Sequence, residues 1–160
     1  MRTALVLILG LCSAPAVAQV HPPEIEAHLA PIIGDWTIPG QEQTYRETCE
    51  WYGNRAFVVC TSSDTSDGSR AQSILGYSKV MARFTYQNYG SSGSSRYELG
   101  YPLGKDGLVY TDERLSGGQP ARITTLVRPQ PDGRLHFVQE RSVKGGPWEK
   151  VVDFNYVRRR

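Results

Sequence analysis

The sequence predicts an all-β fold: an antiparallel up-and-down meander of about 8–10 strands closed into a barrel, with one short N-terminal helix. After Trp36, short runs rich in Tyr, Val, Thr and Phe alternate with Gly, Ser, Asp and Pro at fairly even spacing. A meander of that length must curl, and closure into a barrel removes its exposed edges. The chain has 160 residues with no repeat and no linker, which predicts one domain.

Residues 1–18 have the pattern of a secretory signal peptide. Met1-Arg2 gives a positive start, Ala4–Leu11 is an apolar run, and Ala16-Val17-Ala18 has the small-x-small spacing of a cleavage site. The apolar run is too short to cross a bilayer, and no other run approaches that length. We therefore expect cleavage before Gln19, a mature barrel domain over 19–160, a periplasmic or secreted location, and no membrane insertion.

A short helix is predicted over Glu24–Ile33, directly before the meander. Prolines precede it, and two glutamates fall in its first turn, where the helix dipole favours them. Pro31 tightens or terminates its last turn. Its apolar residues share one face and are Ile25, Leu29, Ile32 and Ile33.

Nine strands follow the helix, separated by turn-forming residues such as Gly53-Asn54, Pro131-Asp132-Gly133 and Gly145-Gly146-Pro147. The predicted strands are Thr44–Tyr52, Ala56–Ser63, Gln72–Val80, Arg83–Tyr89, Ser95–Leu103, Gly107–Leu115, Pro120–Arg128, Arg134–Ser142 and Trp148–Arg158.

Removal of residues 1–18 leaves two cysteines, Cys49 and Cys60, and an even count in an exported chain predicts one disulfide. If residue 49 faces residue 60, Tyr52 faces Phe57 across a short loop, and the bond locks one hairpin. Loss of Arg2 lowers Lys and Arg from 18 to 17 against 16 Asp and Glu. A net charge this balanced argues against a nucleic-acid partner.

Alternation of apolar and polar residues predicts which side chains face the interior. Three inward sets are predicted: Val152, Phe154, Tyr156 and Arg158; Tyr97, Leu99, Tyr101 and Leu103; and Ile123, Thr125 and Val127. The interior is then rich in tyrosine. This pattern fits a packed core whose hydroxyls bond to their neighbours, and it fits equally a cavity with apolar walls and hydroxyl donors. The ligand-binding candidates are Tyr97, Tyr101, Phe154 and Tyr156.

Gly34-Asp35-Trp36 at the start of the first strand, a following antiparallel meander and an arginine near the end of the last strand resemble the calycin superfamily, which includes lipocalins and fatty-acid-binding proteins. The resemblance implies that Trp36 closes the barrel base, that Arg158 packs across its ring, and that Gly34 allows the tight entry. With the turn at Pro131-Asp132-Gly133 and Trp148 in the final strand, the chain also looks like secreted bacterial lipocalin-like domains of unassigned function.

Catalytic alternatives depend on His136, which alternates with Val138 and Glu140 on one strand face. A histidine and a carboxylate on one face can orient each other for acid–base chemistry. Leu135 and Phe137 predict instead that this face points to solvent. Some small ten-stranded barrels of this kind resemble haem binders with one histidine ligand, which would make His136 that ligand. No serine lies in a Gly-x-Ser-x-Gly motif typical of hydrolases.

The sequence therefore favours a non-catalytic, exported barrel that binds a small hydrophobic or amphipathic molecule, with no cofactor and no metal. An enzyme, hydrolase-like or haem-dependent, and a structural or interaction barrel with a filled core are the alternatives. The oligomeric state stays open.

Overall fold

The computed structural model describes residues 21–159, so the signal peptide predicted over 1–18 lies outside the described residues. Helix α1 covers Pro23–Leu29 and the 3₁₀ turn η1 covers Ala30–Ile32. Ten strands follow: β1 (Gly34–Thr37), β2 (Tyr45–Tyr52), β3 (Phe57–Asp64), β4 (Arg70–Ser78), β5 (Arg83–Gly90), β6 (Ser95–Leu103), β7 (Gly107–Ser116), β8 (Gln119–Pro129), β9 (Leu135–Val143) and β10 (Glu149–Arg158).

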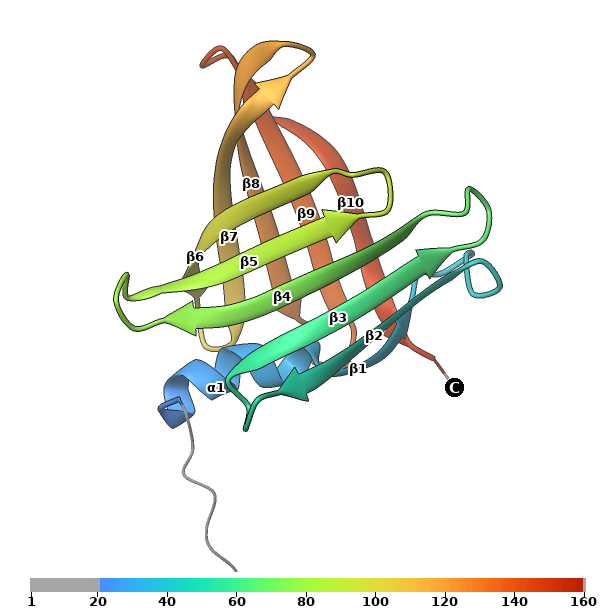
Figure 1. Cartoon of the computed structure of the whole chain (residues 1–160), viewed down its shortest axis with the longest axis vertical. Helices are drawn as coiled ribbons and strands as arrows, with labels where there is room; N and C mark the ends of the chain where they lie inside the picture. The colour runs from blue at the N-terminus through green and yellow to red at the C-terminus, as the bar shows by residue number, and fades with distance from the viewer. Residues whose placement is uncertain (1–20, 160) are drawn as a thin grey trace, which may run out of the picture.

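The ten strands form one closed barrel in which every strand pairs antiparallel with its neighbours in sequence, and β1 closes the ring against β10. The predicted all-β meander closed into a barrel is therefore confirmed. Helix α1 lies across one end of the barrel, which we call the base (Figure 1). The hairpins β3–β4, β5–β6, β7–β8 and β9–β10 turn at the opposite end, which we call the mouth.

Two features of the N-terminal segment differ from the prediction. The α-helix ends at Leu29 rather than Ile33, because Pro31 has no N–H to continue the α-helical bonding and lies in η1. Strand β1 is not among the nine strands that the residue pattern predicts, although the calycin resemblance places Gly34-Asp35-Trp36 at the start of a strand. It has four residues, which is too short for alternation to be recognised, and it pairs with β2 and β10.

The predicted disulfide between Cys49 and Cys60 is present. The two cysteines are directly opposite each other on β2 and β3, and Tyr52 is opposite Phe57, as the predicted register requires. Both cysteines are buried, so the bond crosses the inner face of this hairpin.

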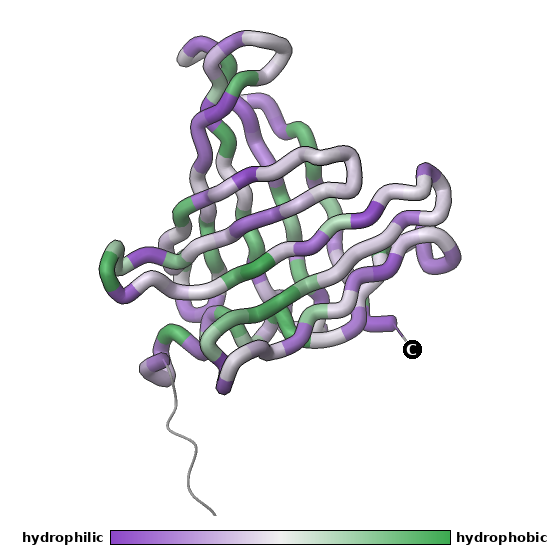
Figure 2. Tube along the Cα trace, viewed as in Figure 1, coloured by the Kyte–Doolittle hydropathy of each residue, from purple (hydrophilic) through white to green (hydrophobic). Residues whose placement is uncertain are grey.

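Apolar side chains fill the base of the barrel. Trp36 is 1% exposed and donates from its indole nitrogen to the Ile32 carbonyl at 2.7 Å. Around it pack Leu29, Ile32, Val58, Leu75, Phe84, Leu108 and Leu135. Figure 2 shows hydrophobic residues in the parts of β3 and β4 that pass closest to α1. The burial of this layer supplies the main free energy that holds the helix against the barrel.

Arg158 and Gly34 complete the base. The Arg158 guanidinium lies 3.8 Å from the centre of the Trp36 ring and donates a hydrogen bond to the Ile33 carbonyl. Gly34 has a φ of 137°, and a β-carbon there would collide with the Arg158 side chain. The glycine therefore makes room for the arginine to reach across the tryptophan.

The predicted face of β6 is wrong. Tyr97 and Tyr101 are 45% and 43% exposed and point outward, whereas Glu98 between them is 1% exposed and points inward. The reason is that the barrel interior above the base is polar, so the apolar alternation of β6 marks its outer side. The inward face predicted for β8 is confirmed, since Ile123 and Thr125 are buried.

Among residues 21–159, none of the helices combines the length and the apolar character that a membrane span requires.

Candidate functional site

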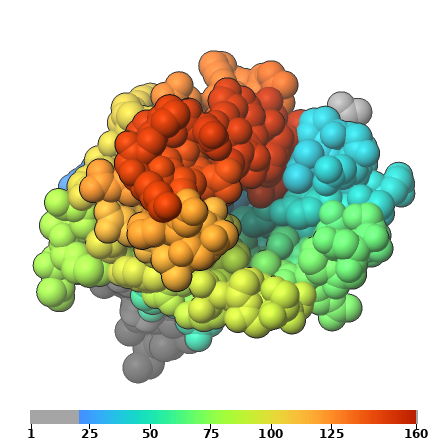
Figure 3. Space-filling model, turned by 90° about the horizontal axis from the view of Figure 1, so that it is seen from above, coloured from blue at the N-terminus to red at the C-terminus, as the bar shows by residue number. Residues whose placement is uncertain are grey.

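A cavity of about 60 Å³ lies inside the barrel, directly above the apolar base layer. Its floor and apolar walls include Trp36, Leu75, Val127 and Phe137. The complete lining is Ile32, Trp36, Glu47, Cys49, Cys60, Ser73, Leu75, Tyr86, Val127, Leu135, Phe137 and Tyr156. Seen from the mouth (Figure 3), the surface is hollowed between the red C-terminal hairpin on one side and the green and cyan loops on the other.

One wall of the cavity carries a hydrogen-bonded carboxyl and two phenols. Tyr45 donates to Glu47 Oε2 at 2.8 Å, and the Tyr45 and Tyr156 hydroxyls are 3.4 Å apart. Burial raises the pKa of the Glu47 carboxyl, although the tyrosine hydrogen bonds act to lower it. Burial also raises the pKa of both tyrosines, which keeps them protonated as donors.

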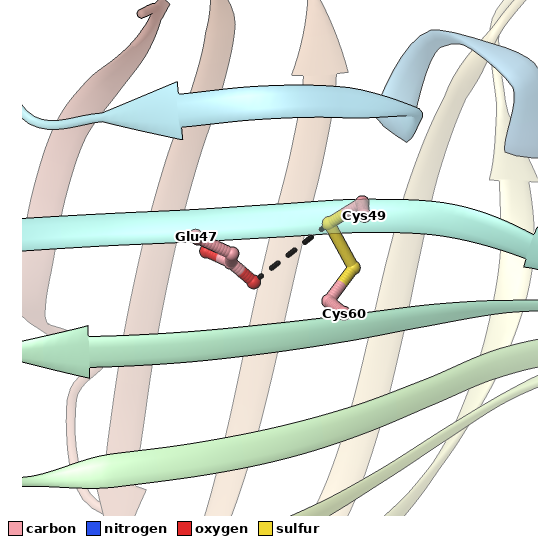
Figure 4. A group of neighbouring side chains, drawn as sticks. All are labelled: Glu47, Cys49 and Cys60. Atoms are coloured by element: carbon pink, nitrogen blue, oxygen red, sulfur yellow. Dashed lines mark hydrogen bonds between the residues drawn. A yellow bond between two sulfur atoms is a disulfide. The ribbon is translucent and has the colours of Figure 1, made fainter.

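The Glu47 carboxyl also lies against the disulfide, 3.9 Å from Cys49 Sγ (Figure 4). A disulfide sulfur has no hydrogen to donate, so a hydrogen bond here requires a protonated Glu47, in agreement with its raised pKa. Within residues 21–159, Glu47, Cys49 and Cys60 bring three potential metal-ligating atoms within 4.8 Å of one another. Because cysteine ligates metals as a thiolate, the oxidised pair offers no such ligand.

The facing wall is a chain of polar side chains on β4, β5 and β6. Asn88 donates to Ser73 Oγ at 2.9 Å, and the Ser73 and Tyr86 hydroxyls are 3.2 Å apart. Arg96 donates from Nη2 to the Tyr86 hydroxyl at 3.2 Å. Tyr86 lines the cavity with its ring, so its hydroxyl joins the apolar cavity to the polar side chains nearer the mouth.

Beyond Tyr86, two further polar residues are enclosed in the barrel. Glu98 lies opposite Tyr86 in the β5–β6 register, and the Tyr110 ring centre is 5.7 Å from that of Tyr86. Both Glu98 and Tyr110 are 1% exposed. Burial raises the pKa of the Glu98 carboxyl, and this outweighs the opposite effect of the Arg96 charge.

The predicted ligand-binding residues divide into two groups. Tyr156 lines the cavity, and Phe154 packs beside it with ring centres 4.8 Å apart. Tyr97 and Tyr101 lie on the outer surface, where Arg83 covers the Tyr101 ring at 4.4 Å. The structure therefore does not bring these two tyrosines together with the cavity.

The histidine considered for catalysis lies outside the barrel. His136 Nε2 is 2.7 Å from Asp153 Oδ1 on the outer face of β9 and β10, and Lys150 also donates to Asp153. None of the residues that line the cavity is a histidine. The arrangement needed for His136 to act inside the barrel, as base or as haem ligand, is not the one in the structure.

Four residues of the site, Glu47, Tyr86, Glu98 and Tyr110, were not among the predicted site residues. The signal for Glu47 was available, because Tyr45, Glu47 and Cys49 alternate on one strand and the disulfide requires Cys49 to point inward. Glu98 had no such signal, since a charged residue between two tyrosines is typical of a solvent-facing position.

Three larger hollows are open to solvent, and Arg114 lines one of them. The largest, about 920 Å³, follows the outward side chains of β2 to β5, including Tyr52, Phe57 and Ile74. Two others of about 510 and 500 Å³ are lined by charged hairpins and strand ends. The interior cavity is smaller, but it alone of these four joins an apolar enclosure to converging hydroxyl and carboxyl groups.

Neither the models of known protein families nor the curated proteins contain a match to this chain.

Proposed function

We propose that this protein is an exported barrel of calycin type that binds a small, partly apolar molecule in its interior without chemical change. The observation that carries the proposal is the cavity above Trp36, where an apolar floor meets the polar groups of Glu47 and Tyr156. Tyr45, behind this lining, donates to Glu47 and lies within 3.4 Å of the Tyr156 hydroxyl. Apolar burial would supply affinity, and the hydroxyls would orient the ligand.

The cavity volume limits what can be bound. A cavity of about 60 Å³ is far below the roughly 300–1,000 Å³ of drug-sized pockets. The buried part of the ligand is therefore a short apolar group. The remainder of the ligand would extend past Tyr86 toward the mouth.

Export is part of the proposal. The signal-peptide pattern of residues 1–18 and a buried disulfide both fit a protein that matures in an oxidising compartment. The periplasm and the extracellular space meet this requirement equally.

The proposal is tested by filling the cavity. Val127→Phe places a ring in the cavity, whereas Val138→Phe places the same ring on the outer face of the adjacent strand. Short-chain amphipathic probes of four carbons are titrated into each protein and followed by two-dimensional NMR. We expect shifts at cavity residues in the wild type and in Val138→Phe, and none in Val127→Phe.

Two outcomes would reject binding in the interior. One is that no probe shifts any cavity resonance of the wild type. The other is that Val127→Phe, folded by the criterion of its amide spectrum, responds as strongly as Val138→Phe. Native mass spectrometry of protein from the producing cell, with the same pair of variants, tests for a co-purified molecule.

A further inference from the structure

The barrel interior contains a cluster of polar atoms without partners. Six buried side-chain nitrogen or oxygen atoms among residues 21–159 make no hydrogen bond, and four of them belong to three residues, Arg96, Glu98 and Tyr110. They are Arg96 Nε, both carboxylate oxygens of Glu98, and the Tyr110 hydroxyl. Because buried polar groups in folded proteins are almost always hydrogen-bonded, this concentration points to an occupant.

Strands β6 and β7 bring the three residues of the cluster together. Arg96 and Glu98 are inward residues of β6, and Tyr110 pairs with Gly100 of the same strand across the β6–β7 ladder. A β-carbon at Gly100 would lie 2.6 Å from Tyr110 Cδ1, so the glycine allows the phenol ring to lie flat against β6. The charge of the Glu98 carboxylate acts on the Tyr110 hydroxyl, and the two groups make no hydrogen bond with each other.

Two ion pairs are too long to be hydrogen bonds: Arg96 with Glu98 inside the cluster, and Arg114 with Asp112, whose charges act on Glu98. Arg96 Nε is 3.7 Å from Glu98 Oε1, and Arg114 is likewise 3.7 Å from Asp112, both longer than a hydrogen bond. The Thr125 hydroxyl acts on Glu98 to lower its pKa, yet within residues 21–159 neither carboxylate oxygen of Glu98 has a hydrogen-bond partner. Thr125 itself accepts from Gln139 at 3.1 Å. Unused donors and acceptors therefore remain on both partners.

The formal charges of the cluster and of the Arg114–Asp112 pair, taken together, cancel. Arg96 and Arg114 carry one positive charge each, and Glu98 and Asp112 carry one negative charge each. The Arg96 and Arg114 side chains are 26% and 34% exposed, whereas Glu98 is enclosed. A charged group placed beside Glu98 would leave one charge there without a counterpart, which is costly. A neutral group that both donates and accepts hydrogen bonds would satisfy Glu98, Arg96 Nε and Tyr110 together.

Tyr86 connects the cluster to the cavity. Its ring lines the cavity, its hydroxyl accepts from Arg96, and Glu98 lies opposite it in the sheet. We propose that Arg96, Glu98 and Tyr110 form a headgroup subsite for a neutral, hydrogen-bonding group, such as a primary carboxamide, of the molecule whose apolar end occupies the cavity. This assignment rests on the proposed function, because it names the other end of the same ligand.

A matched set of headgroups on one chain tests the proposal. Butanamide, butanoate and butylammonium have the same chain length and differ mainly in charge, and their dissociation constants are measured by NMR titration at pH 7. For the wild type we expect butanamide to bind about tenfold more tightly than either ion, because each ion unbalances the cluster.

Two variants then alter the subsite in different ways. Glu98→Gln keeps the shape but leaves Arg96 unbalanced, so we expect the preference for butanamide over butanoate to fall by about tenfold or to reverse. Tyr110→Phe removes one hydroxyl and no charge, so butanamide should weaken while the order of the three headgroups is kept. Tyr97→Phe removes a hydroxyl on the outer face of β6, the strand of Arg96 and Glu98, and should change none of the three dissociation constants.

The outcomes separate this inference from the proposed function. If the three probes bind to the cavity with equal affinity, or if Glu98→Gln leaves their order unchanged, the headgroup subsite is rejected and binding in the cavity stands. If no probe binds to any of the folded proteins, the proposed function fails and the subsite fails with it.

Discussion

At the residue scale, the base of the barrel depends on three side chains that cannot be exchanged independently. Arg158 covers the Trp36 ring and reaches the Ile33 carbonyl only because Gly34 has no side chain. Cation–π contact contributes about 0.5–2 kcal/mol, and a hydrogen bond from a charged donor about 1.5–3 kcal/mol. The tryptophan, the arginine and the glycine therefore form one structural unit.

Gly34→Ala tests this unit through a double-mutant cycle with Arg158→Ala. In the wild-type background the new methyl group displaces Arg158 and also forces alanine into a left-handed φ, so we expect a loss of about 3 kcal/mol or more. In the Arg158→Ala background only the backbone strain, about 1–3 kcal/mol, remains. Urea unfolding of the four proteins should give a coupling of about 1 kcal/mol or more, and additive losses would contradict the unit.

At the element scale, the β2–β3 hairpin is joined by the disulfide and forms the cavity wall that carries Glu47. The cysteines are 11 residues apart in sequence. A bond that closes a loop of this size stabilises the folded state by roughly 3 kcal/mol, largely by restricting the unfolded chain. The hairpin thus combines a local covalent constraint with a wall of the site.

Replacing both cysteines by alanine should therefore lower the free energy of unfolding by about 3 kcal/mol in urea. Dithiothreitol is the control, because it should lower the stability of the wild type toward that of the variant and leave the variant itself unchanged. Equal sensitivity of the two proteins to the reductant would show that the loss has another cause.

The elements also show what the sequence can and cannot predict. Turn residues such as Asp132-Gly133 mark where a strand must stop, so nine strands were placed to within about two residues of their observed ends. The residue pattern does not identify strand β1, because alternation over four residues is too short and the strand is defined by its pairing with β2 and β10. The predicted inward face of β6 is wrong because alternation distinguishes two faces of a strand but does not show which one points inward. At Glu98 the inward face is the polar one.

At the scale of the whole molecule, the barrel is divided along its axis. The base is apolar, is closed by α1 and Trp36, and includes the Tyr110 ring in its core. The interior toward the mouth is polar and includes Arg96 and Glu98. The cavity lies where the two parts meet. An amphipathic ligand matches such a division, and the buried carboxyl groups make the stability of the whole barrel depend on pH.

The buried Glu47 carboxyl makes the stability of the barrel fall as the pH rises. Burial raises its pKa in the folded protein above the ordinary value of 4.5, so from about pH 4.5 up to the raised pKa the folded state holds a proton that the unfolded chain has released. Stability from this group is complete below pH 4.5 and is lost as the pH rises through the folded pKa.

Glu47→Gln removes the titration. As the pH rises, we expect the variant to gain stability relative to the wild type, by about 1.4 kcal/mol for each pH unit by which folding raises the Glu47 pKa. Urea unfolding of both proteins between pH 4 and 8 measures this difference. The depressed pKa values of Asp132 and Asp153 on the surface act in both proteins and cancel in the difference. A relative gain that shrinks with rising pH would mean that the Glu47 pKa is lowered, and that the carboxyl faces the disulfide as an anion.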